Sequence, residues 1–290
     1  MSWRTVVISK SAKLDYQLGY MVVRQESTLK IHIDEVAVLI IENTAVSLTA
    51  VLLSELIKKK IKVIFCDEKR NPSAELVPYY GAHDTSVKIK KQISWTDEIK
   101  SAVWTEIVAE KIRKQSEHLA SWEREECSLL SQYIQEMEFG DSTNREGHAA
   151  KVYFNALFGM SFTRTEENSI NAALNYGYSL LLSVFNREIV ANGYLTQIGV
   201  FHDNMFNQFN LSSDLMEPYR PLVDSIVMEI EPKKFEKEEK YELLRLFNLE
   251  VVIANRNENL NNAVKIYVRS VLDALNDNDP SQIKLYSYEF

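Results

Sequence analysis

Val36-Ala37-Val38-Leu39-Ile40-Ile41 is the longest uninterrupted apolar run in the chain. A short run that is rich in β-branched residues is typical of a buried strand. It is far shorter than the roughly 20 residues that a membrane-spanning helix needs. Similar short runs predict further strands at residues 5–8, 20–23, 29–33 and 61–66. We therefore expect the start of the chain to be rich in β-structure.

The character of the sequence changes after this β-rich start. One helix is expected at about 49–57, capped by Ser47 or Thr49. Residues 67–84 contain turn and linker residues, and beyond them apolar residues recur at helical spacing almost to the end. The predicted fold class is α+β. A small, sandwich-like β-rich domain with its linker would span residues 1–83, and a larger all-α domain would span 84–290.

The composition is that of a globular protein, with 46% hydrophobic and 26% charged residues. Only 8 glycines are present, and the glycine-rich motifs that bind nucleotides are missing. Two cysteines, Cys66 and Cys127, cannot form a four-cysteine zinc site and favour a reducing compartment. With neither a secretory signal nor a membrane span in the sequence, we expect a soluble cytoplasmic protein without membrane partners.

The net charge of −8 argues against a broadly basic nucleic-acid binder. Local basic stretches remain at residues 58–62 and 88–91. Either stretch can be a solvated end of a helix or strand, or part of a track that binds phosphate groups. Any contact with nucleic acid is therefore expected to be confined to one part of the surface.

Three distant stretches each supply a side chain that can bind a metal ion. Glu146 lies in Asn144-Arg145-Glu146-Gly147-His148, His202 closes Gly199-Val200-Phe201-His202, and Glu217 lies in Asp214-Leu215-Met216-Glu217-Pro218-Tyr219-Arg220-Pro221. Two carboxylates and one imidazole can hold Mn²⁺ or Mg²⁺. A divalent ion held in this way can drive phosphoryl transfer on nucleic acid.

Each of these residues also has a purely structural interpretation. Glu146 can belong to a capping box and reach back to the backbone N–H of Thr143. His202, among aromatic neighbours, can be a hydrogen-bonded structural residue. Asp214 and Glu217 can be the N-cap and third residue of one helix, with Pro218 tolerated in its first turn. The sequence alone leaves these alternatives open.

Four motifs in a fixed order carry a resemblance to a known family. They lie at residues 145–154, 171–178, 199–202 and 214–221. With them the chain resembles the CRISPR-associated integrases of spacer acquisition, the first numbered protein family of that system, in the form found in type II loci. The β-rich start also suits this family, so the resemblance spans essentially the whole chain.

The resemblance implies a metal triad of Glu146, His202 and Glu217, holding Mg²⁺ or Mn²⁺. Asp214 would be an acidic neighbour of the ligands, and Asn175 would line the site. Many relatives carry an aspartate where this chain has Glu217. The implied activity is the joining of the 3′-OH ends of short captured DNA duplexes to the CRISPR repeat, with an associated endonuclease activity.

The implied assembly contains several partners. A homodimer would form through the N-terminal domains, and two such dimers would flank a dimer of a small ferredoxin-like CRISPR-associated protein. Other type II adaptation proteins are further expected partners, and double-stranded DNA is the substrate. Two alternatives remain from the residues alone: a non-catalytic DNA-binding scaffold protein, in which the two glutamates cap helices, and a small-molecule metalloenzyme.

Overall fold

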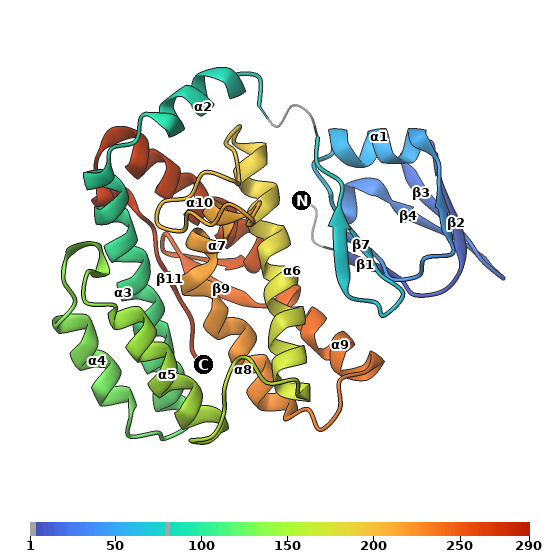
Figure 1. Cartoon of the computed structure of the whole chain (residues 1–290). Helices are drawn as coiled ribbons and strands as arrows, with labels where there is room; N and C mark the ends of the chain where they lie inside the picture. The colour runs from blue at the N-terminus through green and yellow to red at the C-terminus, as the bar shows by residue number, and fades with distance from the viewer. Residues whose placement is uncertain (1–3, 79–81) are drawn as a thin grey trace. The chain divides into compact units, whose positions relative to one another are not determined.

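A computed structural model describes residues 4–78 and 82–290 of the chain. The chain divides into two compact units, Met1–Gly81 and Ala82–Phe290 (Figure 1). Residues 1–3 and 79–81, which the predicted first domain includes, lie outside the described residues. The expected role of the first unit in dimer formation stays a prediction.

The first unit contains two four-stranded sheets, with strand orders β1-β5-β7-β8 and β4-β3-β2-β6. In the first sheet β1, β5 and β7 are parallel and β8 is antiparallel. The elements of the unit are β1 (Arg4–Ile8), β2 (Ala12–Gln17), β3 (Tyr20–Arg24), β4 (Thr28–His32), β5 (Val36–Ile41), β6 (Val46–Leu48), α1 (Ala50–Lys58), β7 (Lys62–Cys66) and β8 (Pro72–Glu75).

Both sheets and α1 contribute to one hydrophobic core, which includes Leu14, Met21, Leu39 and Leu52. All six residues of β5 are buried, and β5 is an inner strand that pairs with β1 and β7. This arrangement confirms the sandwich-like β-rich start. The strands β2, β6 and β8 were not predicted. β8 begins at Pro72, which an edge strand tolerates but which in sequence favours a turn.

The second unit is mostly helical (Figure 1). The long helix α3 contacts α4, α5, α8 and α10, so it runs through the middle of the helical packing. The helices are α2 (Thr85–Ile93), α3 (Asp97–Ser121), α4 (Cys127–Gln135), α5 (Arg145–Phe158), α6 (Ser169–Ala191), α7 (Asn210–Met216), α8 (Arg220–Ile230), α9 (Lys237–Leu243) and α10 (Leu260–Asp277). No helix within residues 4–78 and 82–290 has the length and apolar character needed to cross a membrane.

The predicted α+β fold class is confirmed, but the second domain is mostly helical and not all-α as predicted, because this unit also contains a small sheet. Its strands are β9 (Glu250–Ile253), β10 (Arg256–Asn259) and β11 (Tyr286–Ser287), in the order β10-β9-β11. Ala254 and Asn255 both have positive φ, which makes the tight turn between the antiparallel strands β9 and β10. The β-branched run Val251-Val252-Ile253 carried the signal that the helical interpretation missed.

The start of α3 also differs from its prediction. The three-residue spacing of Ser94 and Asp97 in the sequence predicts a capping box at this point, but Ser94 directly follows the last residue of α2. The N-cap of α3 is Thr96, whose hydroxyl accepts a hydrogen bond from the backbone N–H of Ile99 at 3.3 Å. A hydroxyl directly before the first helical residue is the better placed acceptor.

Gly177 allows α6 and α8 to pack closely. A Cβ atom added at this position would collide with Cγ1 of Val223 on α8, which is completely buried. In an exposed helix interior alanine would be the more stable residue by roughly 1 kcal/mol. Here the collision reverses that preference, because a packed core does not yield to an extra methyl group.

We predict that Gly177→Ala lowers the free energy of unfolding by about 1–3 kcal/mol, the usual cost of overpacking. The double variant Gly177→Ala with Val223→Ala should recover part of the loss, because it removes the colliding methyl groups. Urea unfolding monitored by circular dichroism measures both values. A Gly177→Ala protein as stable as the unsubstituted chain would contradict this packing.

Candidate metal centre

Two acidic side chains from different elements meet at one lysine in the second unit. The Lys111 Nζ atom of α3 lies 2.5 Å from Glu146 Oε1, in the first turn of α5, and 2.5 Å from Glu217 Oε2. The side chains of Lys111 and Glu217 are only 9% and 4% exposed. The structure therefore brings two of the three predicted ligands together, around the positive charge of a buried lysine.

Glu146 is free to face Lys111 because other groups cap α5. The Asn144 side chain accepts a hydrogen bond from the Gly147 N–H at 3.3 Å. The Asp141 carboxylate accepts from the N–H groups of Arg145 and Glu146, at 2.7 and 3.1 Å. The capping-box interpretation of Glu146 is therefore wrong: its carboxylate bonds to Lys111, not to the backbone of Thr143.

Glu217 lies at a break between two helices, where one continuous helix was predicted. α7 ends at Met216, Glu217–Tyr219 is a single 3₁₀ turn, and α8 begins at Arg220. Pro218 and Pro221 have no N–H to continue the α-helical hydrogen bonds, which explains the break. Asp214 lies inside α7 and so does not cap a helix that contains Glu217. That structural alternative is also wrong.

Asp214 instead organises the loop that carries His202. Its buried carboxylate accepts the backbone N–H groups of Val200, Phe201 and His202 at 2.6, 3.0 and 3.1 Å, and it also contacts Nδ1 of His202. Gly199 is required at the start of this loop, because a Cβ there would collide with the backbone oxygen of His202. Three backbone donors and one imidazole thus surround a single carboxylate.

The second ring nitrogen of His202, Nε2, has no hydrogen-bond partner among the described residues. The His202 side chain is 39% exposed. Trp104 and Phe201 stack in parallel at 4.4 Å, and the His202 ring meets both edge-on. His202 is therefore held by its aromatic neighbours and Asp214, as its structural interpretation expected, and still has a free ring nitrogen for a ligand role.

The electrostatics of the cluster follow from burial and pairing. Burial alone would lower the pKa of Lys111, but the carboxylates of Glu217 and Glu146 outweigh it and raise the pKa. Burial would likewise raise the pKa of Glu217, yet Arg220 and Lys111 hold it below its ordinary value. The hydrogen bond to Asp214 raises the pKa of His202 despite partial burial. The lysine stays charged and Glu217 stays ionised near neutral pH.

Asn175 makes no direct contact with the three predicted ligands among the described residues. Its side-chain oxygen accepts a hydrogen bond from Arg164 at 2.7 Å. Arg164 and Arg220 lie over the ring of Tyr178, at 5.4 and 4.6 Å, and Arg220 donates to Glu217 Oε1 at 2.9 Å. Asn175 is thus connected to Glu217 through Arg164, the ring of Tyr178 and Arg220. It also lines a shallow pocket of about 600 Å³ with Arg164, Lys233 and Lys234.

Lys111 and Arg220 are the members of the cluster that sequence reasoning missed. A lysine in a mixed-charge helix usually faces water. Lys111, however, follows Ile107 and Val108 by four and three residues, so it lies on the same buried face of α3. Arg220 is part of the quoted acidic motif and follows Glu217 by three residues, which is the spacing of an ion pair on a helical turn.

The donor types of the cluster fit a hard divalent ion. Glu217 Oε2 is buried and lies at ion-pair distance from Lys111, but no hydrogen bond of good geometry reaches it. Carboxylate oxygens and one imidazole nitrogen are suitable ligands for Mg²⁺ or Mn²⁺. In the described part of the chain, no three His, Cys, Asp or Glu side chains form a ready ion site. The three-ligand set therefore stays a prediction.

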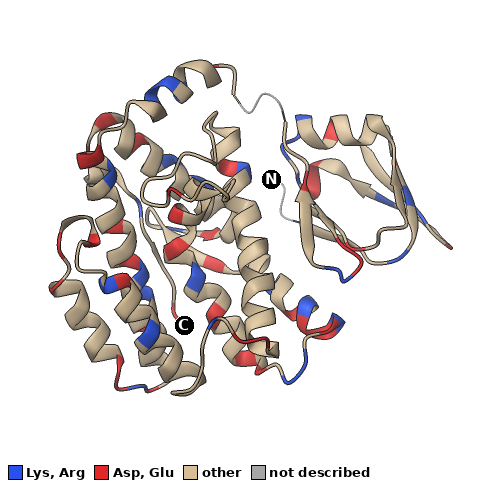
Figure 2. Cartoon of the chain, in the orientation of Figure 1, with Lys and Arg blue, Asp and Glu red and all other residues tan. Residues whose placement is uncertain are grey.

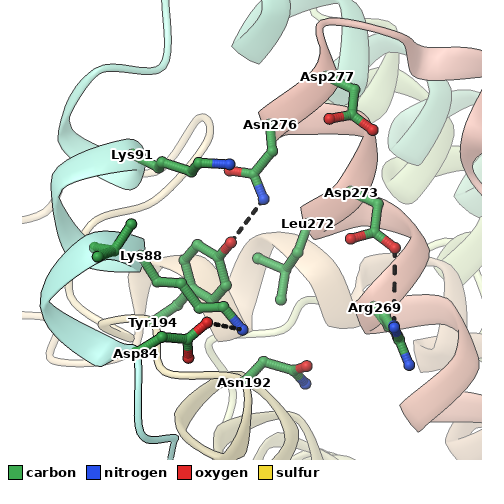
Figure 3. A pocket seen from close by; sticks show the side chains of 11 residues that line it. Asp84, Lys88, Lys91, Asn192, Tyr194, Arg269, Leu272, Asp273, Asn276 and Asp277 are labelled. Carbon is green, nitrogen blue, oxygen red and sulfur yellow. Dashed lines mark hydrogen bonds and ion pairs between the residues drawn. The ribbon is translucent and has the colours of Figure 1, made fainter.

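A separate pocket of about 440 Å³ lies between α2, the residues after α6, and α10 (Figure 3). Its charges are largely matched internally: Lys88 pairs with Asp84 at 3.5 Å, and Arg269 with Asp273 at 3.9 Å. Tyr194 accepts a hydrogen bond from Asn276 at 2.6 Å. None of the predicted ligands lines this pocket, so it is not part of the candidate metal centre.

The fold and the cluster together define a class of protein: an α+β chain with a β-rich first unit and a mostly helical second unit, in which two glutamates meet at a buried lysine. The family model described as "CRISPR associated protein Cas1" matches residues 5–247. The chain therefore belongs to the Cas1 family of CRISPR-associated proteins.

The similar proteins support this membership. The CRISPR-associated endonuclease Cas1 of Neisseria meningitidis serogroup C (strain 8013) is 32% identical over 293 residues, which cover 98% of this chain and 96% of that protein. A CAS1 protein from Thermotoga maritima has a TM-score of 0.75 at 17% identity, covering 94% of this chain and 97% of its own. The fold predicted from the resemblance is thus confirmed.

Two further solved structures share the fold. A casposase bound to an integration product has a TM-score of 0.74 at 16% identity, covering 96% of this chain and 92% of its own. A chain of a Cas6-RT-Cas1–Cas2 complex has a TM-score of 0.73 at 17% identity. The match covers 97% of this chain but only 36% of that longer one.

We predict that the pKa of His202 in the metal-free protein lies above the ordinary value of 6.5 and falls in Asp214→Asn, because the hydrogen bond that His202 donates to Asp214 is the main cause of the rise. Histidine signals followed by NMR over pH measure both values. The control is Asp203→Asn, which changes an exposed neighbouring carboxylate. A pKa that is the same in the Asp214→Asn and unsubstituted proteins would contradict the assigned role of Asp214.

Proposed function

We propose that this chain is a divalent-metal-dependent integrase of CRISPR adaptation. It would join the 3′-OH ends of short captured DNA duplexes to the CRISPR repeat by phosphoryl transfer, and it would also cleave DNA. The observation that carries the proposal is the meeting of Glu146 and Glu217 at Lys111 in a member of the Cas1 family. The name of the Neisseria relative as an endonuclease and the casposase bound to an integration product support it.

Glu146, His202 and Glu217 would hold the ion, which when bound supplies a Lewis acid that stabilises charge developing on a phosphate. The contacts of this chain prepare two of these ligands. Asp214 binds Nδ1 of His202 and so leaves Nε2 for the ion. Arg220 binds Oε1 of Glu217 and so leaves Oε2. In each of these two side chains, one atom is fixed by a neighbouring residue and the other is left to bind the ion.

Contact with DNA would be local, since the chain as a whole carries a net charge of −8. In Figure 2 the positions of Lys and Arg (blue) and of Asp and Glu (red) intermingle along the ribbon of the second unit. Near the candidate site, Arg164, Lys233 and Lys234 line the shallow pocket that contains Asn175. We propose this group as one place where DNA phosphates bind, because its two lysines are exposed and its arginine, Arg164, is connected to Glu217 through the ring of Tyr178 and Arg220.

The proposed assembly is a homodimer formed through the first unit, with a small ferredoxin-like CRISPR-associated partner and a cytoplasmic location. The Cas6-RT-Cas1–Cas2 complex among the similar structures supports a partner of this kind. The scaffold alternative assumed that Glu146 and Glu217 cap helices. Neither carboxylate has that role, since they pair with Lys111 and Arg220, so the strand-joining assay below decides between a scaffold and an integrase.

We predict that Glu217→Gln lowers strand joining in Mn²⁺ by about 100-fold or more, because it removes an anionic ligand worth several kcal/mol of charge stabilisation. The assay contains the purified chain, its small partner, a short duplex and a repeat-bearing plasmid, with and without Mn²⁺. Glutamine keeps the shape of the side chain, so DNA binding should change little.

The matched control for this variant is Glu229→Gln on α8, which changes an exposed glutamate paired with Arg245. The Glu229→Gln protein should join strands at the same rate as the unsubstituted chain. Joining by Glu217→Gln at the same rate as this control would contradict the catalytic proposal and favour a scaffold protein.

We also predict that affinity for a short DNA duplex falls steeply with salt concentration, since each phosphate contact releases a counterion. A fluorescence anisotropy titration over a range of salt concentrations measures this slope. Lys233→Gln combined with Lys234→Gln should reduce the magnitude of this slope by about two, one for each phosphate contact that is lost. A flat response to salt would contradict DNA binding through phosphates and would favour a metalloenzyme that acts on small molecules.

A further inference from the structure

We propose that Lys111 is a built-in counter-cation of this site, which binds the same two carboxylates as the divalent ion and competes with it. In the metal-free protein its ammonium would hold Glu146 and Glu217 together. When the ion binds, the ammonium would leave the position between them. This inference deepens the proposed function, because it concerns the same ligands, but it can be tested without DNA.

The geometry supports competition. The same nitrogen atom lies 2.5 Å from an oxygen of each glutamate, and among the described residues these are the only anionic side chains at ion-pair distance from it. A divalent ion that binds both oxygens needs the same position, since it too must lie within about 2–2.5 Å of each. The ammonium and the ion therefore cannot both occupy it.

The surrounding contacts explain why the lysine, not the arginine, would move. Arg220 is fixed between Glu217, at 2.9 Å, and the ring of Tyr178, at 4.6 Å. Among the described residues, the Lys111 ammonium is paired only with the two carboxylates, and it ends a flexible chain of four methylene groups. When the ammonium leaves, Glu217 keeps the guanidinium as a partner. The site can therefore exchange one cation for another without leaving Glu217 unpaired.

Lys114 provides an internal comparison on the same helix. It is also buried, and it lies 2.7 Å from Glu117, 3.5 Å from Glu110 and 5.0 Å from the ring centre of Tyr286. No histidine contacts this second cluster among the described residues. Lys114 thus resembles Lys111 in burial and pairing but lies outside the candidate metal centre. The two lysines allow a matched experiment.

The test measures Mn²⁺ binding to the full chain without DNA, by the electron paramagnetic resonance signal of free Mn²⁺. Lys111→Met should bind Mn²⁺ at least about tenfold more tightly than the unsubstituted chain, because a positive charge next to both ligands is removed. Lys111→Arg, which keeps the charge, and Lys114→Met should stay within about threefold of it. The rise in Tm on adding Mn²⁺ should be larger for Lys111→Met than for the unsubstituted chain.

Unchanged or weaker Mn²⁺ binding by Lys111→Met would overturn the proposal, and so would the absence of saturable binding in both proteins. Should Lys111→Met fail to fold, ¹⁵N-lysine NMR of the unsubstituted chain decides. The ammonium signal of Lys111, identified by its loss in Lys111→Arg, should shift as Mg²⁺ is added, whereas that of Lys114 should not. A Lys111 signal that is constant at saturating Mg²⁺ would overturn the proposal.

The outcome is separable from that of the proposed function. A chain that shows this competition but joins no DNA strands would contradict the integrase and leave the role of Lys111 intact. A chain that joins strands while Lys111→Met binds Mn²⁺ no more tightly would contradict only the role of Lys111.

Discussion

Two glutamates that face each other inside a helical domain need a positive charge between them, and Lys111 supplies it. Carboxylates taken out of water are stable only when paired, and removal of one partner of such a buried pair typically costs about 3–5 kcal/mol. Through this ammonium α3 is joined to the start of α5 and to the turn between α7 and α8. Arg220 adds a second cation on the far oxygen of Glu217. The charge balance of the site and the packing of three elements thus depend on the same contact.

Much of the fold could be predicted because its elements have strong periodic patterns. The six-residue run of β5 was expected as a strand, and helical spacing was expected beyond residue 84, where the structure has α3. The small sheet of β9, β10 and β11 was not expected. Its strands are only two to four residues long, and β11 comes from the distant end of the chain. Such pairing depends on tertiary contacts, which no local pattern records.

The candidate site was predictable in its residue types but not in its connections. Motif resemblance selected Glu146, His202 and Glu217, and the structure brings the two glutamates together. Sequence gave no indication that Asp214 accepts the backbone N–H groups of the His202 loop, because that contact joins residues twelve to fourteen positions apart. The sequence also did not indicate that Lys111 is buried. A lysine is expected to be exposed even where it lies on an apolar helix face, because charged residues are rarely fully buried.

The central claim is that Glu146, His202 and Glu217 share one divalent ion. The most direct measurement is an anomalous difference map from a crystal of this chain that contains Mn²⁺. The account predicts one strong peak within about 2.5 Å of an oxygen of each glutamate and of Nε2 of His202, with the Lys111 ammonium moved away from its place between the carboxylates. A peak bound by other side chains, or none at this cluster at saturating Mn²⁺, would contradict it.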